Sequence, residues 1–174
     1  KLPELRARRA TVIVNVCGTT IAEYAEVSRI LSDADGVAAI ELNISCPNIK
    51  EGGIQFGCSL NGTFDVVSAV RKVTRLPIMP KLTPNVTDVA SFARAAEEAG
   101  ADAVSLVNTF LAMVIDVETR RPRISNGVGG LSGPAIRPIA VRMVHECHAA
   151  VKIPVVGMGG IMDARDALEF MIAG

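Results

Sequence analysis

The stretch Glu41-Leu-Asn-Ile-Ser-Cys-Pro-Asn48 continues an apolar run that begins at Val37 and ends it in a polar turn. The run predicts a buried strand, and Pro47 holds Cys46 extended and keeps the chain from entering a helix there. In parallel α/β proteins, chemistry gathers at the carboxyl ends of strands, where the loops vary freely. A strand that carries amides and a thiol to its tip therefore predicts a site. An isolated cysteine before a turn is more often a structural residue.

Length and charge limit the class of protein. The 174 residues are enough for one domain, taken as 1–174, with a sizeable core. The 18 basic and 18 acidic residues balance, so no overall field favours nucleic acid or an anionic membrane. No apolar run approaches the ~20 residues needed to span a bilayer, and no signal-peptide pattern begins the chain. We expect a soluble, cytoplasmic protein.

The cysteines and histidines predict no metal site and no disulfide. Cys17, Cys46, Cys58 and Cys147 are irregularly spaced and contain no C-x-x-C pair, which argues against a zinc or iron–sulfur cage in this chain. The cluster His145-Glu-Cys-His148 does not have the spacing His-Glu-x-x-His. We interpret this cluster as part of a solvated helix face.

Apolar runs alternate with amphipathic stretches along the chain. The predicted strands are 12–16, 37–44, 76–82, 103–107 and 153–156. The predicted helices are 21–31, 64–74, 89–99, 134–150 and 163–172. Pro80 lies inside the third strand, where it removes a ladder donor and predicts irregular pairing. Residues 110–132 form a longer, glycine-containing excursion.

Strand and helix alternate about five times, which predicts an α/β protein with a parallel sheet and helices outside it. The last helix precedes a point where the next strand is due, by analogy with Glu97–Gly100. A complete (β/α)8 TIM barrel needs about 250 residues. We therefore expect an incomplete barrel that lacks its first strands and its last strand, an internal fragment of a longer protein. An open doubly wound sheet is the alternative fold.

Polar residues and glycines follow each predicted strand, and the parallel arrangement brings them to one rim. These residues are Asn15, Asn43, Cys46, Asn48, Lys81, Asn108, Thr109 and Gly157–Gly160. Each one alone has an ordinary explanation, since asparagine is common in turns and lysine on surfaces. A glycine turn between a strand and a helix also has a mechanism for anion binding, through free N–H groups and the positive helix end.

These motifs resemble those of the class 1 dihydroorotate dehydrogenases, most closely the catalytic subunit of the 1B type. The resemblance covers Val12 to Gly174, and its motifs are 41–48, Lys81-Leu-Thr-Pro-Asn85, Asn108-Thr109, Gly129–Pro138 and Gly157-Met-Gly-Gly-Ile161. Members of that family are FMN-dependent (β/α)8 barrels that oxidise dihydroorotate to orotate in pyrimidine synthesis. The resemblance therefore implies this fold, this cofactor and this reaction.

The resemblance also implies roles for single residues. Cys46 would be the base that removes a proton from C5 of the substrate, while hydride leaves C6 for the flavin. The residues that would contact FMN are Asn15, Asn43, Lys81, Val107, Gly133, Gly159 and Gly160. The residues that would bind the pyrimidine are Asn43, Asn48, Asn108 and Thr109. The loop 49–61 would close over the substrate, and Cys58 in it has no expected role.

The chemistry of these residue types agrees with the implied roles. Asparagine offers donors and acceptors that match the amide-like edges of orotate. Lys81 beside the flavin would stabilise negative charge on its reduced form. A thiol with a pKa of about 8.5 can act as a base near neutral pH. The class 2 enzymes, which are membrane-bound, resemble this pattern but have serine at the position of Cys46.

A 1B-type protein implies partners and leaves alternatives open. FAD and a 2Fe-2S cluster would belong to a separate electron-transfer subunit, through which NAD would accept electrons, and the barrels would pair as homodimers. The final acceptor stays open between NAD, fumarate and others. One alternative is the flavin domain of a dihydropyrimidine dehydrogenase-like protein, which shares the Ser-Cys-Pro and Lys-Leu-Thr-Pro-Asn motifs. Another is a catalytically incompetent barrel fragment, a scaffold or interaction module that binds FMN weakly or not at all in isolation.

Overall fold

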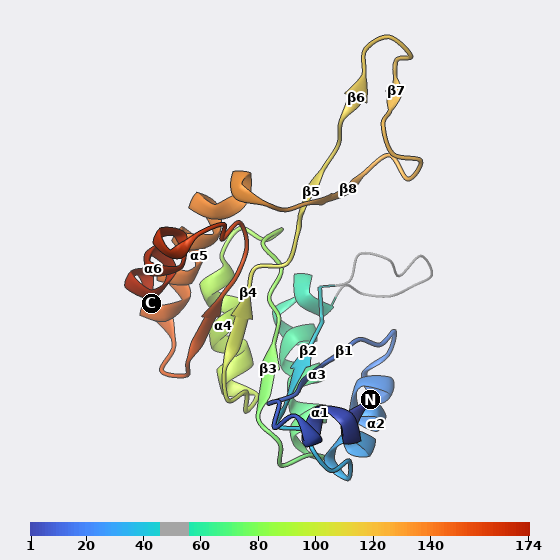
Figure 1. Cartoon of the computed structure of the whole chain (residues 1–174), viewed down its shortest axis with the longest axis vertical. Helices are drawn as coiled ribbons and strands as arrows, with labels where there is room; N and C mark the ends of the chain where they lie inside the picture. The colour runs from blue at the N-terminus through green and yellow to red at the C-terminus, as the bar shows by residue number, and fades with distance from the viewer. Residues whose placement is uncertain (46–55) are drawn as a thin grey trace.

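A layer of parallel strands forms the centre of the molecule (Figure 1). The computed structural model describes residues 1–45 and 56–174. The strands of the layer are β1 (Ile13–Val16), β2 (Ala39–Leu42), β3 (Ile78–Pro80), β4 (Val104–Leu106) and β9 (Val155–Gly157). β1 pairs with β2, β2 with β3, and β4 with β9, all in parallel. The result is a mixed α/β fold whose strands follow one another in chain order.

Helices cover one face of this layer. They are α2 (Ile21–Ser32), α3 (Leu60–Arg71), α4 (Val89–Glu98), α5 (Arg137–Ala150) and α6 (Ala164–Ala173), and α1 (Leu2–Ala7) precedes β1. Two short 3-10 turns, Phe56–Cys58 and Pro134–Ile136, precede α3 and α5. Consecutive helices from α2 to α6 pack side by side. The opposite face of the layer is open in the described part of the chain, since Ile13 is 51% and Val156 41% exposed.

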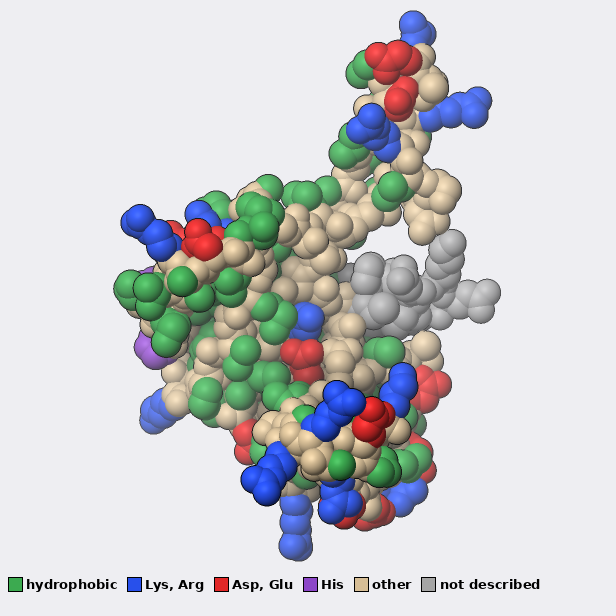
Figure 2. Space-filling model, in the orientation of Figure 1, with side chains coloured by type: hydrophobic (Ala, Val, Ile, Leu, Met, Phe, Trp, Pro, Cys, Tyr) green, Lys and Arg blue, Asp and Glu red, His purple; other side chains and the backbone are tan. Residues whose placement is uncertain are grey.

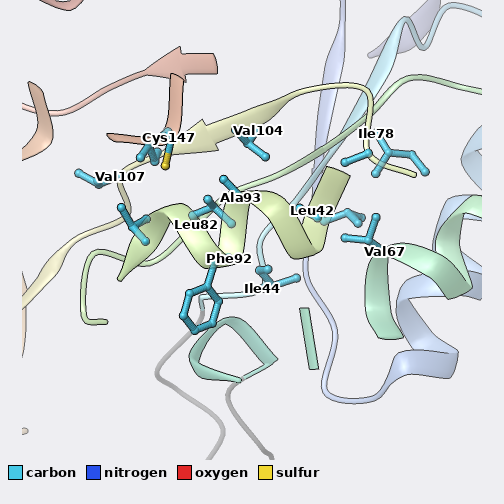
Figure 3. Packing of buried hydrophobic residues seen from close by; sticks show 14 of the residues in the cluster. Leu42, Ile44, Val67, Ile78, Leu82, Phe92, Ala93, Val104, Val107 and Cys147 are labelled. Carbon is cyan, nitrogen blue, oxygen red and sulfur yellow. The ribbon is translucent and has the colours of Figure 1, made fainter. Parts of the chain in front are cut away.

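The core lies between the strands and the helices (Figure 3). Figure 3 shows Leu42, Ile44, Val67, Ile78, Leu82, Phe92, Ala93, Val104, Val107 and Cys147. The residues of β2 alternate, because Ile40 and Leu42 are fully buried whereas Glu41 between them is not. Successive side chains of a strand point to opposite faces, so the buried set faces the helices.

Pro80 explains an irregular joint between β3 and β4. Ile78 accepts backbone hydrogen bonds from Asp102 and Ala103 of the β4 side, and the Leu82 N–H donates to Ser105. Pro80 lies midway between Ile78 and Leu82 and also faces β4, but proline has no N–H to donate. Regular pairing is therefore reduced to a single parallel bridge between Lys81 and Ser105. The predicted irregularity is confirmed, and the layer still continues across it.

An antiparallel arm rises from the carboxyl end of β4. It consists of β5 (Phe110–Ala112) paired with β8 (Gly129–Leu131), and β6 (Ile115–Asp116) paired with β7 (Arg121–Pro122). The arm projects away from the rest of the chain in Figure 1, and Figure 2 shows acidic and basic side chains at its tip. The sequence predicted an excursion here but not its strands, because these pairs are two or three residues long.

The other elements agree with the sequence predictions within a few residues. The largest shift is in α3, which begins at Leu60 instead of Phe64 because the Ser59 hydroxyl accepts from the Gly62 N–H and caps the helix there. Thr20 and Glu23 form a capping box at α2, and Asp88 and Asp163 cap α4 and α6. In the part of the chain that the structure describes, no helix is long and apolar enough to cross a membrane.

Candidate active site

Polar side chains line the open face of the strand layer near its carboxyl end. Glu41 and Asn43 lie two residues apart around β2, so they share the face opposite to Leu42. The register places Asn15 beside Glu41, and the bridge places Lys81 beside Ser105. Residues from β1, β2, β3 and β4 thus meet on one surface, as the parallel arrangement predicted.

Glu41 joins three strands on this surface. Its Oε2 accepts a hydrogen bond of 2.5 Å from Nδ2 of Asn15, and its Oε1 accepts one of 2.7 Å from the Ser105 hydroxyl. A carboxylate only accepts, so Asn15 must present its NH2 group to Glu41 and keep its carbonyl oxygen for another partner. Ser105 is fully buried, and Glu41 satisfies its hydroxyl.

Asn43 and Asn108 form an amide pair across the strand tips. Nδ2 of Asn108 donates to Oδ1 of Asn43 over 3.2 Å, while Oδ1 of Asn108 accepts from the Thr109 N–H at 2.8 Å. The Tyr24 hydroxyl of α2 donates to the Asn43 carbonyl oxygen at 2.7 Å and holds that backbone in place. Within the described residues, the NH2 group of Asn43 binds no acceptor and remains a donor for a ligand.

Lys81 supplies the positive charge of this surface. The Ser45 hydroxyl donates to its carbonyl oxygen at 2.7 Å, and its N–H donates to the Leu42 carbonyl at 2.8 Å, so its backbone is held on both sides. Within residues 1–45 and 56–174, no carboxylate lies within ion-pair distance of its ammonium group. The charge therefore remains available for a ligand.

Asn85 fixes the root of the arm, next to Thr109. Its Nδ2 donates to the Thr109 carbonyl at 3.0 Å and its Oδ1 accepts from the Leu111 N–H at 2.9 Å. Gly130 on the returning strand packs against the Thr109 side chain, and a Cβ there would overlap its hydroxyl. The last residue of the Lys81–Asn85 motif thus positions a predicted substrate residue.

The predicted phosphate-binding glycines also come together. Gly159 and Gly160 follow β9 with φ of +117° and +78°, a region that favours glycine. A Cβ on Gly160 would lie 2.7 Å from the carbonyl oxygen of Gly133, and one on Gly159 would lie 3.5 Å from Val107. In the described part of the chain, no acceptor is bound by the N–H of Gly159 or Gly160. Two free donors therefore lie beside Val107 and Gly133.

The structure places the described residues of the predicted site in two groups. Asn15, Asn43, Lys81, Asn108 and Thr109 meet on the strand tips, while Val107, Gly133, Gly159 and Gly160 meet around the turn after β9. Cys46 and Asn48 lie outside the described residues. Sequence reasoning missed Glu41, Ser105 and Asn85. The alternation of β2 was the available signal, since Glu41 shares a face with Asn43.

Two other thiols have raised pKa values. Burial, followed by the negative charges of Glu146 and Asp88, raises the pKa of Cys147 to about 12, so this thiol is protonated at neutral pH. Burial also raises the pKa of Cys58.

The histidines form no metal site in the described part of the chain. His145 contacts the Ala173 carbonyl oxygen through Nδ1 at 3.2 Å. The described residues hold no group of three or more histidine, cysteine, aspartate or glutamate side chains arranged for a metal ion.

A protein-family model described as dihydroorotate dehydrogenase matches residues 1–174 of this sequence. The chain belongs to the dihydroorotate dehydrogenase family. Among curated proteins it is 57% identical over 173 residues to the "Dihydroorotate dehydrogenase B (NAD(+)), catalytic subunit" of Desulforudis audaxviator, covering 99% of this chain and 56% of that protein. The match confirms the resemblance to the 1B type.

Other relatives carry the same name. The catalytic subunit of Citrifermentans bemidjiense is 55% identical over 174 residues, covering 100% of this chain and 57% of the relative. That of Porphyromonas gingivalis is 52% identical over 172 residues, with 99% and 56% covered. The chain thus spans a little over half the length of the curated relatives that it matches.

Proposed function

We propose that this chain carries the FMN and substrate site of an enzyme that oxidises (S)-dihydroorotate to orotate in pyrimidine (UMP) biosynthesis. The observation that carries the proposal is the meeting of Asn43, Lys81 and Asn108 at the tips of neighbouring parallel strands, beside the glycine turn after β9. The family to which the chain belongs and the printed names of its relatives support the reaction.

The residues present fit FMN. Within residues 1–45 and 56–174, the N–H groups of Gly159 and Gly160 bind no acceptor and suit a phosphate. In the same residues the ammonium of Lys81 pairs with no carboxylate, and it suits an electron-accepting ring. When bound, FMN supplies the acceptor for the hydride that leaves C6 of the substrate. Asn15, held by Glu41, would offer its carbonyl oxygen to the cofactor, and Val107 and Gly133 would border it.

The remaining roles concern the substrate. Asn43, Asn108 and Thr109 bind the pyrimidine through their amide and hydroxyl groups, joined by Asn48. Cys46 removes the proton from C5, because its thiolate is a competent base near neutral pH. The Lys81 charge favours the transfer of an electron pair to the cofactor.

The proposed architecture is a (β/α)8 barrel to which this chain contributes about five units. Helices on one face and an open opposite face support it, because an open doubly wound sheet carries helices on both faces. β1 and β9 each have a single partner strand in the described part of the chain. The further proposals are a cytoplasmic homodimer of barrels and a partner subunit with FAD and a 2Fe-2S cluster, which passes electrons to NAD.

The test uses an extended chain, in which the segments of the D. audaxviator subunit outside the matched range are joined to the ends of this one. We expect it to bind FMN and to reduce it with dihydroorotate under anaerobic conditions, followed by loss of the 450 nm flavin absorbance. The Cys46→Ala variant should retain FMN and lose most of the reduction at neutral pH. Cys46→Ser should be slow and recover partly at high pH.

Two outcomes would overturn parts of the proposal. Reduction by dihydrouracil but not by dihydroorotate would favour the dihydropyrimidine dehydrogenase-like reaction. Near-normal reduction in Cys46→Ala would remove Cys46 from the mechanism. We expect the 174-residue chain alone to bind FMN weakly and to be inactive, since two sheet edges and an open strand face would remain uncovered. An active, FMN-bound monomer of these residues alone would contradict this last point.

A further inference from the structure

A buried carboxylate joins the turn after β9 to the start of α5. The side chain of Asp166, in the first turn of α6, is 8% exposed. Its Oδ2 accepts a hydrogen bond of 2.9 Å from the Met162 N–H, and its Oδ1 forms an ion pair with Nη1 of Arg137. Arg137 is the first residue of α5. One side chain therefore holds three segments: the turn, the start of α5 and the start of α6.

The turn at Gly133 and the turn at Gly159–Gly160 meet next to this ion pair. A Cβ on Gly160 would lie 2.9 Å from Cβ of Arg137, in addition to its contact with Gly133. A Cβ on Gly159 would lie 2.9 Å from Cδ1 of Ile136, the residue before Arg137. The spacing between Gly133 and Gly159–Gly160 is thus set by how closely the turn packs on the start of α5.

Arg137 is committed to this contact and is not a free anion-binding group. Besides Asp166, its Nε contacts Oε2 of Glu169 at 3.1 Å, so two carboxylates face one guanidinium. A phosphate at the turn would be attracted by the N–H groups of the glycines instead. Arg137 also neutralises the buried carboxylate of Asp166, which would otherwise repel a phosphate.

We propose that the Asp166–Arg137 pair positions the phosphate-binding turn, by holding Gly159 and Gly160 at the spacing from Gly133 in which their N–H groups bind a phosphomonoester. This inference rests on the proposed FMN site and adds to it two positioning residues that do not touch the cofactor. These two residues affect the binding of the FMN phosphate and not the binding of the ring. The pair therefore sets the preference for FMN over riboflavin.

The test measures that preference in the extended chain. FMN and riboflavin are titrated separately, with quenching of flavin fluorescence as the signal, for the unsubstituted chain and for Asp166→Asn. Asparagine keeps the shape and the acceptor for Met162 but loses the charge. We expect FMN affinity to fall about tenfold or more, the size of a lost charge-assisted hydrogen bond, while riboflavin affinity changes less than about twofold. Glu169→Gln removes the exposed partner of the same guanidinium and should leave both affinities unchanged.

The outcomes separate this inference from the proposed function. If the unsubstituted extended chain binds neither flavin, the proposed function and the inference both fail. If it binds FMN and Asp166→Asn keeps the same preference over riboflavin, the inference alone is wrong. Equal losses for both flavins would show a general structural role and would also overturn it. Should Asp166→Asn not fold, Arg137→Lys keeps the positive charge but loses the planar guanidinium that reaches Asp166 and Glu169 together. We expect from it a smaller loss that is again confined to FMN.

Discussion

The two faces of β2 differ in almost every physical property, although they belong to the same four residues. Ile40 and Leu42 face the helices and are fully buried among apolar neighbours. Glu41, together with Asn43 just beyond the strand, faces the open side and accepts hydrogen bonds from β1, from β4 and from the residues that follow β4. The comparison teaches that one face fixes where the strand lies and the other fixes what the strand tip can bind. Substitutions one residue apart should separate these two properties.

The largest expected contrast is in thiol reactivity. Cys147 lies in the helix-side core with a pKa of about 12, whereas Cys17 follows β1 and is exposed. At pH 8 a thiol with that pKa is a thiolate in only about one part in ten thousand, and the thiolate is the reactive form. Iodoacetamide should therefore modify Cys17 in the native protein and Cys147 only after unfolding in urea. Peptide mapping by mass spectrometry locates the label, and rapid native labelling of Cys147 would contradict the described core.

The next contrast is in stability. Leu42→Ala removes a buried side chain and should lower the free energy of unfolding by about 2–5 kcal/mol. Asn43→Ala, one residue away, removes one side-chain hydrogen bond on the open face and should cost about 1 kcal/mol. Urea unfolding of this chain, followed by circular dichroism, gives both values. Equal losses would mean that the two faces are not distinct in the way described.

A smaller effect tests the polar face by itself. Glu41→Leu leaves the buried Ser105 hydroxyl without its acceptor, which should cost about 1–3 kcal/mol. Adding Ser105→Ala removes the orphaned hydroxyl and should recover part of that loss. The coupling energy from the double-mutant cycle, measured by urea unfolding, is the deciding quantity. Strictly additive changes would show that the 2.7 Å contact contributes nothing.

The same alternation explains how much could be predicted from the sequence. Each of the five strands and the helix after it were found within a few residues, because short apolar runs alternate with amphipathic, capped stretches. The meeting of polar residues at the strand tips was also predicted, because parallel strands bring their carboxyl ends together. Asn43 and Asn108, 65 positions apart in sequence, do meet there.

The contacts that were missed depend on partners far away in the sequence. Glu41 is an unremarkable acidic residue until Asn15 and Ser105 are placed on either side of it. Likewise, the arm is held by very short pairs and by Asn85, whose partners are 24 and 26 residues away. The alternation of β2 does place Glu41 on the face of Asn43, but no local pattern names the partners of Glu41 or Asn85. Only the three-dimensional arrangement reveals these contacts.

The smallest expected effect concerns α2, where the helix layer meets the strand tips. Thr20 and Glu23 form a capping box next to Tyr24, whose hydroxyl holds the Asn43 carbonyl. Hydrogen bonds from the side chain and then the backbone of Thr19 lower the pKa of Glu23 below its ordinary value of 4.5. The folded state therefore favours the ionised form. Its contribution to stability is fully present above pH 4.5 and is lost as the pH falls through the lowered pKa of the folded state.

Glu23→Gln keeps an acceptor for these N–H groups but cannot ionise, so the variant should lack this pH dependence. We expect it to unfold at a slightly lower urea concentration than the unsubstituted chain at pH 7, and the gap should close as the pH falls below 4.5. Arg8, which follows α1 and forms an exposed ion pair with Glu4, offers a control through Arg8→Gln. A gap that stays constant between pH 7 and pH 3 would mean that the ionised Glu23 does not stabilise this corner. The helix layer would then support the strand tips at this corner through Tyr24, by its packing and by its hydrogen bond to the Asn43 carbonyl.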